Sequence, residues 1–86
     1  MASYNLVFRP SVQKDLQSLP TKMVARVLER VEKLREEPFP RGSLKLAGAE
    51  NLYRLRIGDY RVIYGVDHSA QCVLVHYVRH RRDAYR

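Results

Sequence analysis

The sequence has little of what stabilises many small folds. Its single cysteine, Cys72, rules out a disulfide within the chain, and no Cys and His residues cluster at the spacing of a zinc site. No apolar run is long enough to cross a bilayer, and the first residues lack the charged-then-apolar layout of a secretion signal. We therefore expect a cytoplasmic protein that needs no metal or other cofactor and has no membrane partner.

Acidic residues are also scarce relative to basic ones. The chain carries 16 Lys and Arg against 9 Asp and Glu, a net charge of +7. The second part of the chain, 54–86, has seven Arg, no Lys and three Asp. A basic surface of this kind attracts polyanions through the release of counterions. Nucleic acid is the partner this charge favours, with an acidic protein as the alternative.

The 86 residues suffice for one domain, 1–86, with a single small core. Hydrophobic periodicity predicts a strand, two helices that pack as a hairpin, and a three-stranded antiparallel meander. The expected boundaries are a strand at 3–8, helices at 10–19 and 22–36, a loop that contains Gly42 and Gly48, and strands at 52–57, 60–66 and 71–78. Thr21 is expected to cap the second helix. The predicted fold class is α+β, with the helices packed on one face of the sheet.

A two-residue turn at 58–59 fixes which residues face each other in the first hairpin of the meander. In this register Arg56 lies directly opposite Arg61, and Arg54 lies on the same face. Continued through the next loop, the register places Arg61 opposite His76. The other face then forms the core, and its expected members are Tyr53, Leu55, Ile57, Tyr60, Val62, Tyr64, Val66, Val73, Val75 and Tyr77.

Like charges directly opposite on a sheet destabilise it by a few tenths to about 1 kcal/mol per pair. In one interpretation the arginines extend into solvent or pair with helix acids or Asp83. In the other, which we favour, the face binds an RNA phosphate. The residues after the last strand, 79–86, add four Arg, His80 and Tyr85. Imidazole titrates near neutrality, and aromatic rings stack on unpaired bases, so both side chains suit RNA chemistry.

Two stretches resemble the RelE/ParE toxin superfamily: LKLAG at 44–48 and LYRLRIGDYRVIY at 52–64. The ending HRRDAYR at 80–86 resembles the RelE branch in particular. The resemblance spans the whole chain, because a strand, a helical hairpin and a meander follow in this order in the family. It implies a toxin of a type II toxin–antitoxin system. Such a toxin is a metal-independent endoribonuclease that cuts messenger RNA in the ribosomal A site and so inhibits translation.

The resemblance also implies which residues form the site. Attack of a ribose 2′-OH on the adjacent phosphate needs a base, cations for the phosphorane and an acid for the leaving oxygen. The residues expected to be catalytic are Arg54, Arg56, Arg61, Arg81, Tyr85 and His80. Those expected to bind RNA elsewhere are Arg41, Lys45, Arg79 and Arg82. Some relatives have Lys where this chain has Arg54 and Arg56. Arginine stays protonated, so the base is left open among His80, Tyr85 and a ribosomal group.

Two other functions stay open from sequence. One is a ParE-like poison of DNA gyrase, and the other is a non-catalytic protein that binds an antitoxin and acts as a corepressor. For the RelE-like toxin, the implied partners are the ribosome, messenger RNA and a cognate acidic, RelB-like antitoxin. Operator DNA is expected to be contacted only through that antitoxin.

Overall fold

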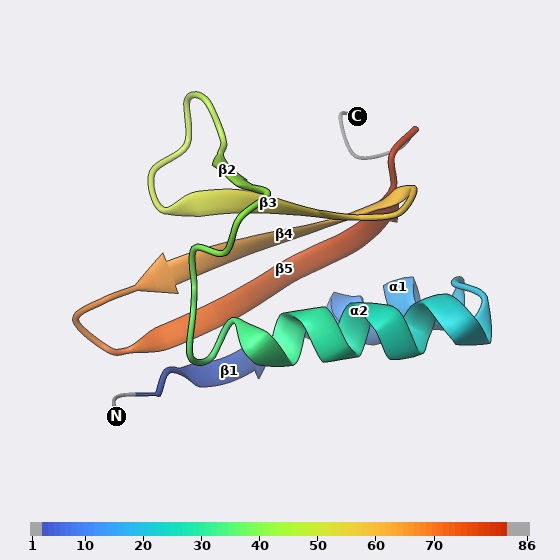
Figure 1. Cartoon of the computed structure of the whole chain (residues 1–86), viewed down its shortest axis with the longest axis horizontal. Helices are drawn as coiled ribbons and strands as arrows, with labels where there is room; N and C mark the ends of the chain where they lie inside the picture. The colour runs from blue at the N-terminus through green and yellow to red at the C-terminus, as the bar shows by residue number, and fades with distance from the viewer. Residues whose placement is uncertain (1–2, 83–86) are drawn as a thin grey trace.

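The computed structural model describes residues 3–82, which form two helices and a five-stranded sheet (Figure 1). The elements in chain order are β1 (Asn5–Phe8), α1 (Pro10–Gln17), α2 (Thr21–Lys33), β2 (Ser43–Lys45), β3 (Leu52–Ile57), β4 (Tyr60–Asp67) and β5 (Cys72–His80). The strand order is β1-β5-β4-β3-β2. Only β1 and β5 run parallel; the other neighbours are antiparallel. The expected α+β class and the three-stranded meander are confirmed. None of the helices at 3–82 is long and apolar enough to cross a membrane.

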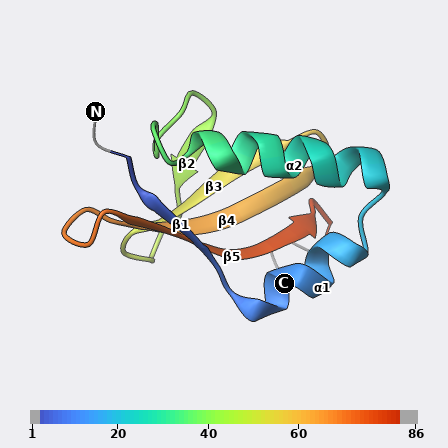
Figure 2. The same ribbon diagram turned by 90° about the horizontal axis from the view of Figure 1, so that it is seen from below.

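Both helices lie against the same face of the sheet (Figures 1 and 2). Proline at the first helical position starts α1, where its missing N–H costs nothing. Pro20, not Thr21, occupies the N-cap position of α2, and no side chain caps that end. The expected threonine cap is therefore wrong. The helix starts at Thr21, one residue earlier than a Thr21 cap would allow, because the φ of proline suits the residue that leads into a helix.

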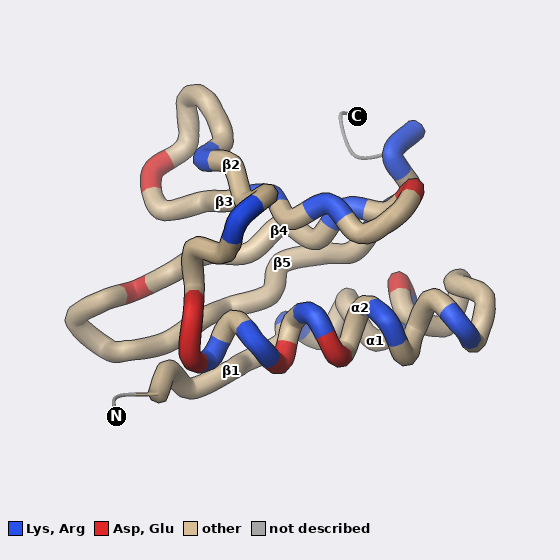
Figure 3. Tube along the Cα trace, in the orientation of Figure 1, with Lys and Arg blue, Asp and Glu red and all other residues tan. Residues whose placement is uncertain are grey.

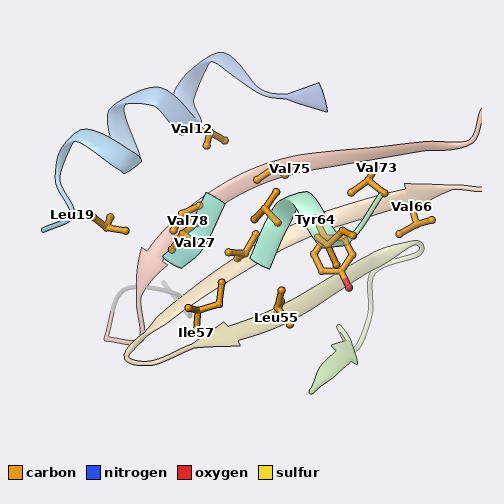
Figure 4. Close-up of a cluster of buried hydrophobic side chains, with 13 residues drawn as sticks. Val12, Leu19, Val27, Leu55, Ile57, Tyr64, Val66, Val73, Val75 and Val78 are labelled. Atoms are coloured by element: carbon orange, nitrogen blue, oxygen red, sulfur yellow. The ribbon is translucent and has the colours of Figure 1, made fainter. Parts of the chain in front are cut away.

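The core fills the layer between the helices and the sheet (Figure 4). Its largest fully buried side chain is Tyr64, whose hydroxyl donates a 2.7 Å hydrogen bond to the Pro38 carbonyl. Burial raises the pKa of this hydroxyl, so it stays a neutral donor. The other fully buried side chains are Leu34, Leu55, Ile57, Val12, Val27, Val31, Val62, Val73 and Val75. Because every sheet member of this set points to the helices, the opposite face is left to other residues.

Two features of the sheet differ from the sequence prediction. The expected loop with Gly42 and Gly48 contains a short strand, β2, which pairs with β3. The pairing of β4 with β5 is shifted: Val66 faces Val73, and Arg61 faces Arg79 where His76 was expected. A bulge opposite Ile63/Tyr64 adds one residue to β5, so the alternation of faces changes at that point.

Candidate active site

The hairpin of β3 and β4 places three arginines on the sheet face that α1 and α2 leave uncovered. Gly58 opens its turn with φ of 60°, the left-handed conformation that mirror-image hairpin turns require. Arg56 lies directly opposite Arg61, and Arg54 lies opposite Ile63. The register predicted for this hairpin is confirmed. It brings three cations onto one short stretch of sheet.

The strand β5 adds a fourth arginine to this face. Arg79 lies opposite Arg61, and Tyr77 lies opposite Ile63. The Arg79 guanidinium carbon lies 4.2 Å from the centre of the Tyr77 ring, a cation–π contact. The sequence assigned Tyr77 to the core face and His76 to the position across from Arg61. Both assignments are wrong. The loop after β4 shifts the register by two residues and the bulge by one more, so Arg79 faces Arg61; the bulge also moves Tyr77 out of the core and leaves Val78 to fill that place.

Arg81 joins the cluster from just beyond β5. Its backbone N–H donates a 2.7 Å hydrogen bond to the Asp59 carbonyl, which fixes the residue after β5 against the β3–β4 turn. Burial is the main cause that lowers the pKa of the Arg61 guanidinium below its ordinary value. The charges of three neighbours lower it further, in the order Arg54, Arg56 and Arg81. We call Arg54, Arg56, Arg61 and Arg81 the arginine cluster; Arg79 lies beside it.

The interior of the cluster is shielded from water. The Nε atom of Arg54 and the Nε and Nη1 atoms of Arg61 have almost no accessible surface. In Figure 3 the basic positions of β3 and β4 and those just after β5 lie toward the same end of the sheet. Since the four charges repel one another, a bound anion would relieve the repulsion, and partial burial would strengthen its attraction to the guanidinium groups. The arrangement therefore suits a phosphate group.

His80 lies on the other side of the sheet. It pairs with Tyr60, and the two rings meet edge to face with centres 5.3 Å apart. Tyr60 packs against the core on the helix-covered face, so the His80 ring belongs to that face and not to the arginine cluster. Its Nδ1 accepts a hydrogen bond from the Arg82 N–H at 3.3 Å. Tyr85, the other expected catalytic side chain outside the cluster, lies beyond the described residues.

Two of the expected RNA-binding residues lie apart from the cluster. Arg41 and Lys45 line a pocket of about 580 Å³ whose walls include Phe39, Tyr53 and His68. The Phe39 ring lies edge to face with Tyr53, and its centre is 5.4 Å from that of His68. Exposed cations next to aromatic rings form a surface that can contact single-stranded nucleic acid. Arg82 is exposed beside the cluster.

Sequence reasoning missed Asp15 as a supporting residue. Its Oδ2 accepts a 3.0 Å hydrogen bond from the Val78 N–H. Val78 lies beyond the part of β5 that pairs with β1, so this carboxylate takes the place of a strand partner. Asp15 thereby holds the segment that carries Arg79 and Arg81. No signal in the sequence indicates this contact, because 63 residues separate the two groups.

His76 lies at the bulge, where its Nδ1 accepts a hydrogen bond from Arg9 Nη1 at 3.3 Å. Burial, and then the Arg9 charge, lower the pKa of His76. The unfolded chain, with a histidine pKa of about 6.5, therefore takes up this proton more readily than the folded one. The contribution of neutral His76 to the free energy of unfolding is complete above about pH 6.5. It is lost as the pH falls toward the pKa that His76 has in the folded protein.

We expect His76→Gln, which is neutral at every pH, to lose less free energy of unfolding than the wild type between pH 7.5 and pH 5.5. Urea denaturation at both pH values measures the two losses. His68→Gln is the matched control, because it replaces an exposed histidine outside the bulge. An equal loss in wild type and His76→Gln would contradict the lowered pKa of His76 in the folded protein.

No group of three or more His, Cys, Asp or Glu side chains that could hold a metal ion occurs between residues 3 and 82.

Comparison with known proteins agrees with this geometry. The family model described as "ParE toxin of type II toxin-antitoxin system, parDE" matches residues 6–85. Putative toxin RelE1 of Methanocaldococcus jannaschii is 30% identical over 86 residues, which cover 96% of each chain. Toxin RelE of Mycobacterium tuberculosis is 32% identical over 84 residues, covering 96% of this chain and 87% of the relative.

Solved structures give the same result. The archaeal RelE–RelB complex from Pyrococcus horikoshii OT3 contains a chain that is 38% identical, with a TM-score of 0.83, covering 95% of this chain and 99% of that one. The toxin–antitoxin complex RelBE2 of Mycobacterium tuberculosis gives 30% identity and a TM-score of 0.79, covering 92% and 99%. The isolated Escherichia coli RelE toxin shares the fold at 22% identity and a TM-score of 0.79.

The fold and these relatives define the class: a toxin of a type II toxin–antitoxin system. More narrowly, the chain belongs to the RelE/ParE superfamily and is a RelE-like toxin.

Proposed function

We propose that this toxin is a ribosome-dependent endoribonuclease that cleaves messenger RNA in the A site and so inhibits translation. The 2′-oxygen of a ribose attacks the adjacent phosphorus, and the bond from phosphorus to the 5′-oxygen breaks. The products are a 2′,3′-cyclic phosphate and a free 5′-OH. This chemistry needs no metal, because the nucleophile belongs to the RNA itself. The observation that carries the proposal is the arginine cluster, whose mutual repulsion a phosphate would relieve.

Each member of the cluster has a role in this mechanism. Arg61 and Arg81 stabilise the charge that develops on the phosphorane oxygens. Arg54 and Arg56 hold the phosphate, because a guanidinium that stays protonated cannot serve as the base. His80 is a weak candidate for proton transfer, since its ring contacts Tyr60 on the other face of the sheet. We therefore assign that step to Tyr85 or to a ribosomal group.

The remaining basic residues bind RNA without touching the scissile phosphate. Arg41 and Lys45 lie in the aromatic pocket described above, and Arg79 and Arg82 lie beside the cluster. In this proposal they contact ribosomal RNA and hold the toxin in the A site, through contacts that weaken as the salt concentration rises. The site of action is then the cytoplasm, where ribosomes translate.

We propose an acidic, RelB-like antitoxin as the second partner. The structures of the Pyrococcus and Mycobacterium relatives are complexes with such a protein. A net charge of +7 favours an acidic segment that folds on the toxin and neutralises the arginine cluster or displaces the residues after β5. In this proposal operator DNA is contacted only through the antitoxin.

Hydrogen exchange on the toxin, alone and with its antitoxin, tests this contact. We expect added protection over 52–63 and a change, in either direction, over 79–82, because inhibition acts on the site. Protection confined to the exposed face of α2, with both segments unchanged, would contradict direct inhibition. The matched control is the toxin with an unrelated acidic peptide, which should protect neither segment.

A gyrase poison is the second candidate, since the family model that matches is described as a ParE toxin. Brief expression in cells, followed by mapping of messenger 5′ ends against reading frame, separates the two functions. New 5′ ends in phase with codons would support ribosome-dependent cleavage. Intact messages together with stabilised DNA breaks would support the gyrase poison instead. Toxicity that survives loss of the whole arginine cluster would favour a non-catalytic, antitoxin-binding corepressor.

A further inference from the structure

A pocket opens beside the arginine cluster, under the loop that joins β2 to β3. This loop rises on the side of the sheet away from the helices (Figure 1). The pocket has a volume of about 340 Å³. The walls are Leu46, Ala47, Ala49, Ile63 and Tyr77, together with Arg54 and Arg61. The pocket is thus apolar on most sides and cationic on one. A volume at the small end of the range for ligand pockets suits a single planar group.

Tyr77 supplies the aromatic wall, and the β-bulge is the reason it lies there. Without the extra residue in β5, alternation from Val75 would place the ring on the core face. The Arg79 guanidinium lies 4.2 Å from the ring centre and so fixes the ring from one side. Ile63, which pairs with Tyr77, is only 3% exposed and closes the base of the pocket. The ring is therefore held in place before any ligand binds.

Among RNA components, this combination matches a nucleobase and its phosphate. Unpaired bases bind proteins by stacking on aromatic rings and apolar surfaces, and the attached phosphate binds guanidinium groups. Arg54 and Arg61 belong both to the cluster and to this pocket, so a phosphate on them brings a neighbouring base to the entrance. The small side chains of Ala47 and Ala49 leave the room that a base requires.

We propose that this pocket binds one unpaired nucleobase of single-stranded RNA next to the phosphate on Arg54 and Arg61, with Tyr77 as the stacking side chain. The proposal rests on the proposed function for its substrate class, and it adds a base-binding subsite to the phosphate site. The pocket then fixes which nucleotide lies beside the scissile bond. Its shape makes it a determinant of base preference.

The test uses a short single-stranded RNA whose 2′-hydroxyls are all methylated, so that it cannot be cleaved by 2′-OH attack. A matched series replaces one base at a time by an abasic residue. Isothermal titration of the full-length toxin measures Kd for each RNA. We expect one abasic position to weaken binding by wild type about 10-fold. Tyr77→Phe should keep this difference, and Tyr77→Leu should abolish it.

Three controls separate the outcomes. Phe8→Leu changes an exposed aromatic residue of β1, remote from the pocket, and should behave as wild type. Ala49→Leu, which fills the pocket while leaving Tyr77 intact, should weaken binding of the intact RNA to the level of the abasic one. Near-UV circular dichroism of each variant confirms that it is folded.

Three results would overturn the proposal. If wild type bound no RNA more tightly than an Arg54→Ala/Arg61→Ala double variant, the phosphate site on these two arginines would fail and the subsite with it, whereas the proposed function is tested separately by cleavage on ribosomes. If wild type bound the intact RNA well and every abasic RNA equally well, the phosphate site would stand and the subsite would be wrong. The subsite would also be wrong if Tyr77→Leu kept the wild-type difference.

Discussion

Replacement of Arg61 or Arg81 by alanine is expected to slow messenger cleavage on programmed ribosomes by about 100-fold or more in each case. Removal of one donor to the transition state costs about 3 kcal/mol in comparable sites. Both residues lie in the cluster, and their charges act on each other. Single-turnover kinetics isolates the chemical step from binding.

The matched control is Arg35→Ala. This arginine pairs with Glu32 on α2 at 3.2 Å and belongs to the helical layer. It should cleave at the wild-type rate. The free energy of unfolding of Arg61→Ala should not fall below that of the wild type, since removal of one of four repelling charges relieves strain. Near-wild-type cleavage by both cluster variants would refute their catalytic assignment.

Tyr64→Ala is expected to lower the free energy of unfolding by about 3–5 kcal/mol, as for other large buried aromatic residues. A domain of this size is stable by only about 5–15 kcal/mol, so the variant should be largely unfolded at moderate urea concentrations. Tyr64→Phe keeps the ring and loses the hydrogen bond to Pro38, and should cost about 1 kcal/mol. Urea denaturation measures both.

Leu44→Ala serves as the control for this pair. Leu44 is 55% exposed on β2, so its truncation should change the free energy of unfolding by less than about 0.5 kcal/mol. If Tyr64→Ala cost no more than Leu44→Ala, the buried ring would not hold the loop and the sheet together. Tyr64 belongs to β4, the strand that carries Arg61, but its side chain lies in the core. Tyr64→Ala should therefore lose cleavage only under conditions in which the protein is unfolded.

The sequence predicted those parts of the site that depend on residues close together in the chain. A two-residue turn with glycine at its first position allows one register, and this register fixed Arg54, Arg56 and Arg61 on one face. The next strand was predicted less well, because a bulge has no residue pattern of its own in β5. A two-residue shift in the loop after β4 and one extra residue at the bulge placed Arg79 opposite Arg61 and turned Tyr77 out of the core.

Other differences have the same physical origin: contacts between distant parts of the chain decide them. β2 is three residues long, too short to show a period, and it forms because β3 offers a free edge. The face on which His80 lies follows from the bulge four residues earlier. Its imidazole suggested chemistry, but its location next to Tyr60 follows only from the assembled sheet.

The parallel pairing of β1 with β5 has a consequence for the newly synthesised chain. Asn5 pairs with Cys72 and Phe8 with Val75, so the first strand made has to wait for the last before it finds its partner. Loop closure over such a distance is slow, and it cannot begin until β5 has left the exit tunnel of the translating ribosome. Arg81 follows β5 and emerges later still. The arginine cluster is therefore complete only after β3, β4 and β5 have all left the tunnel.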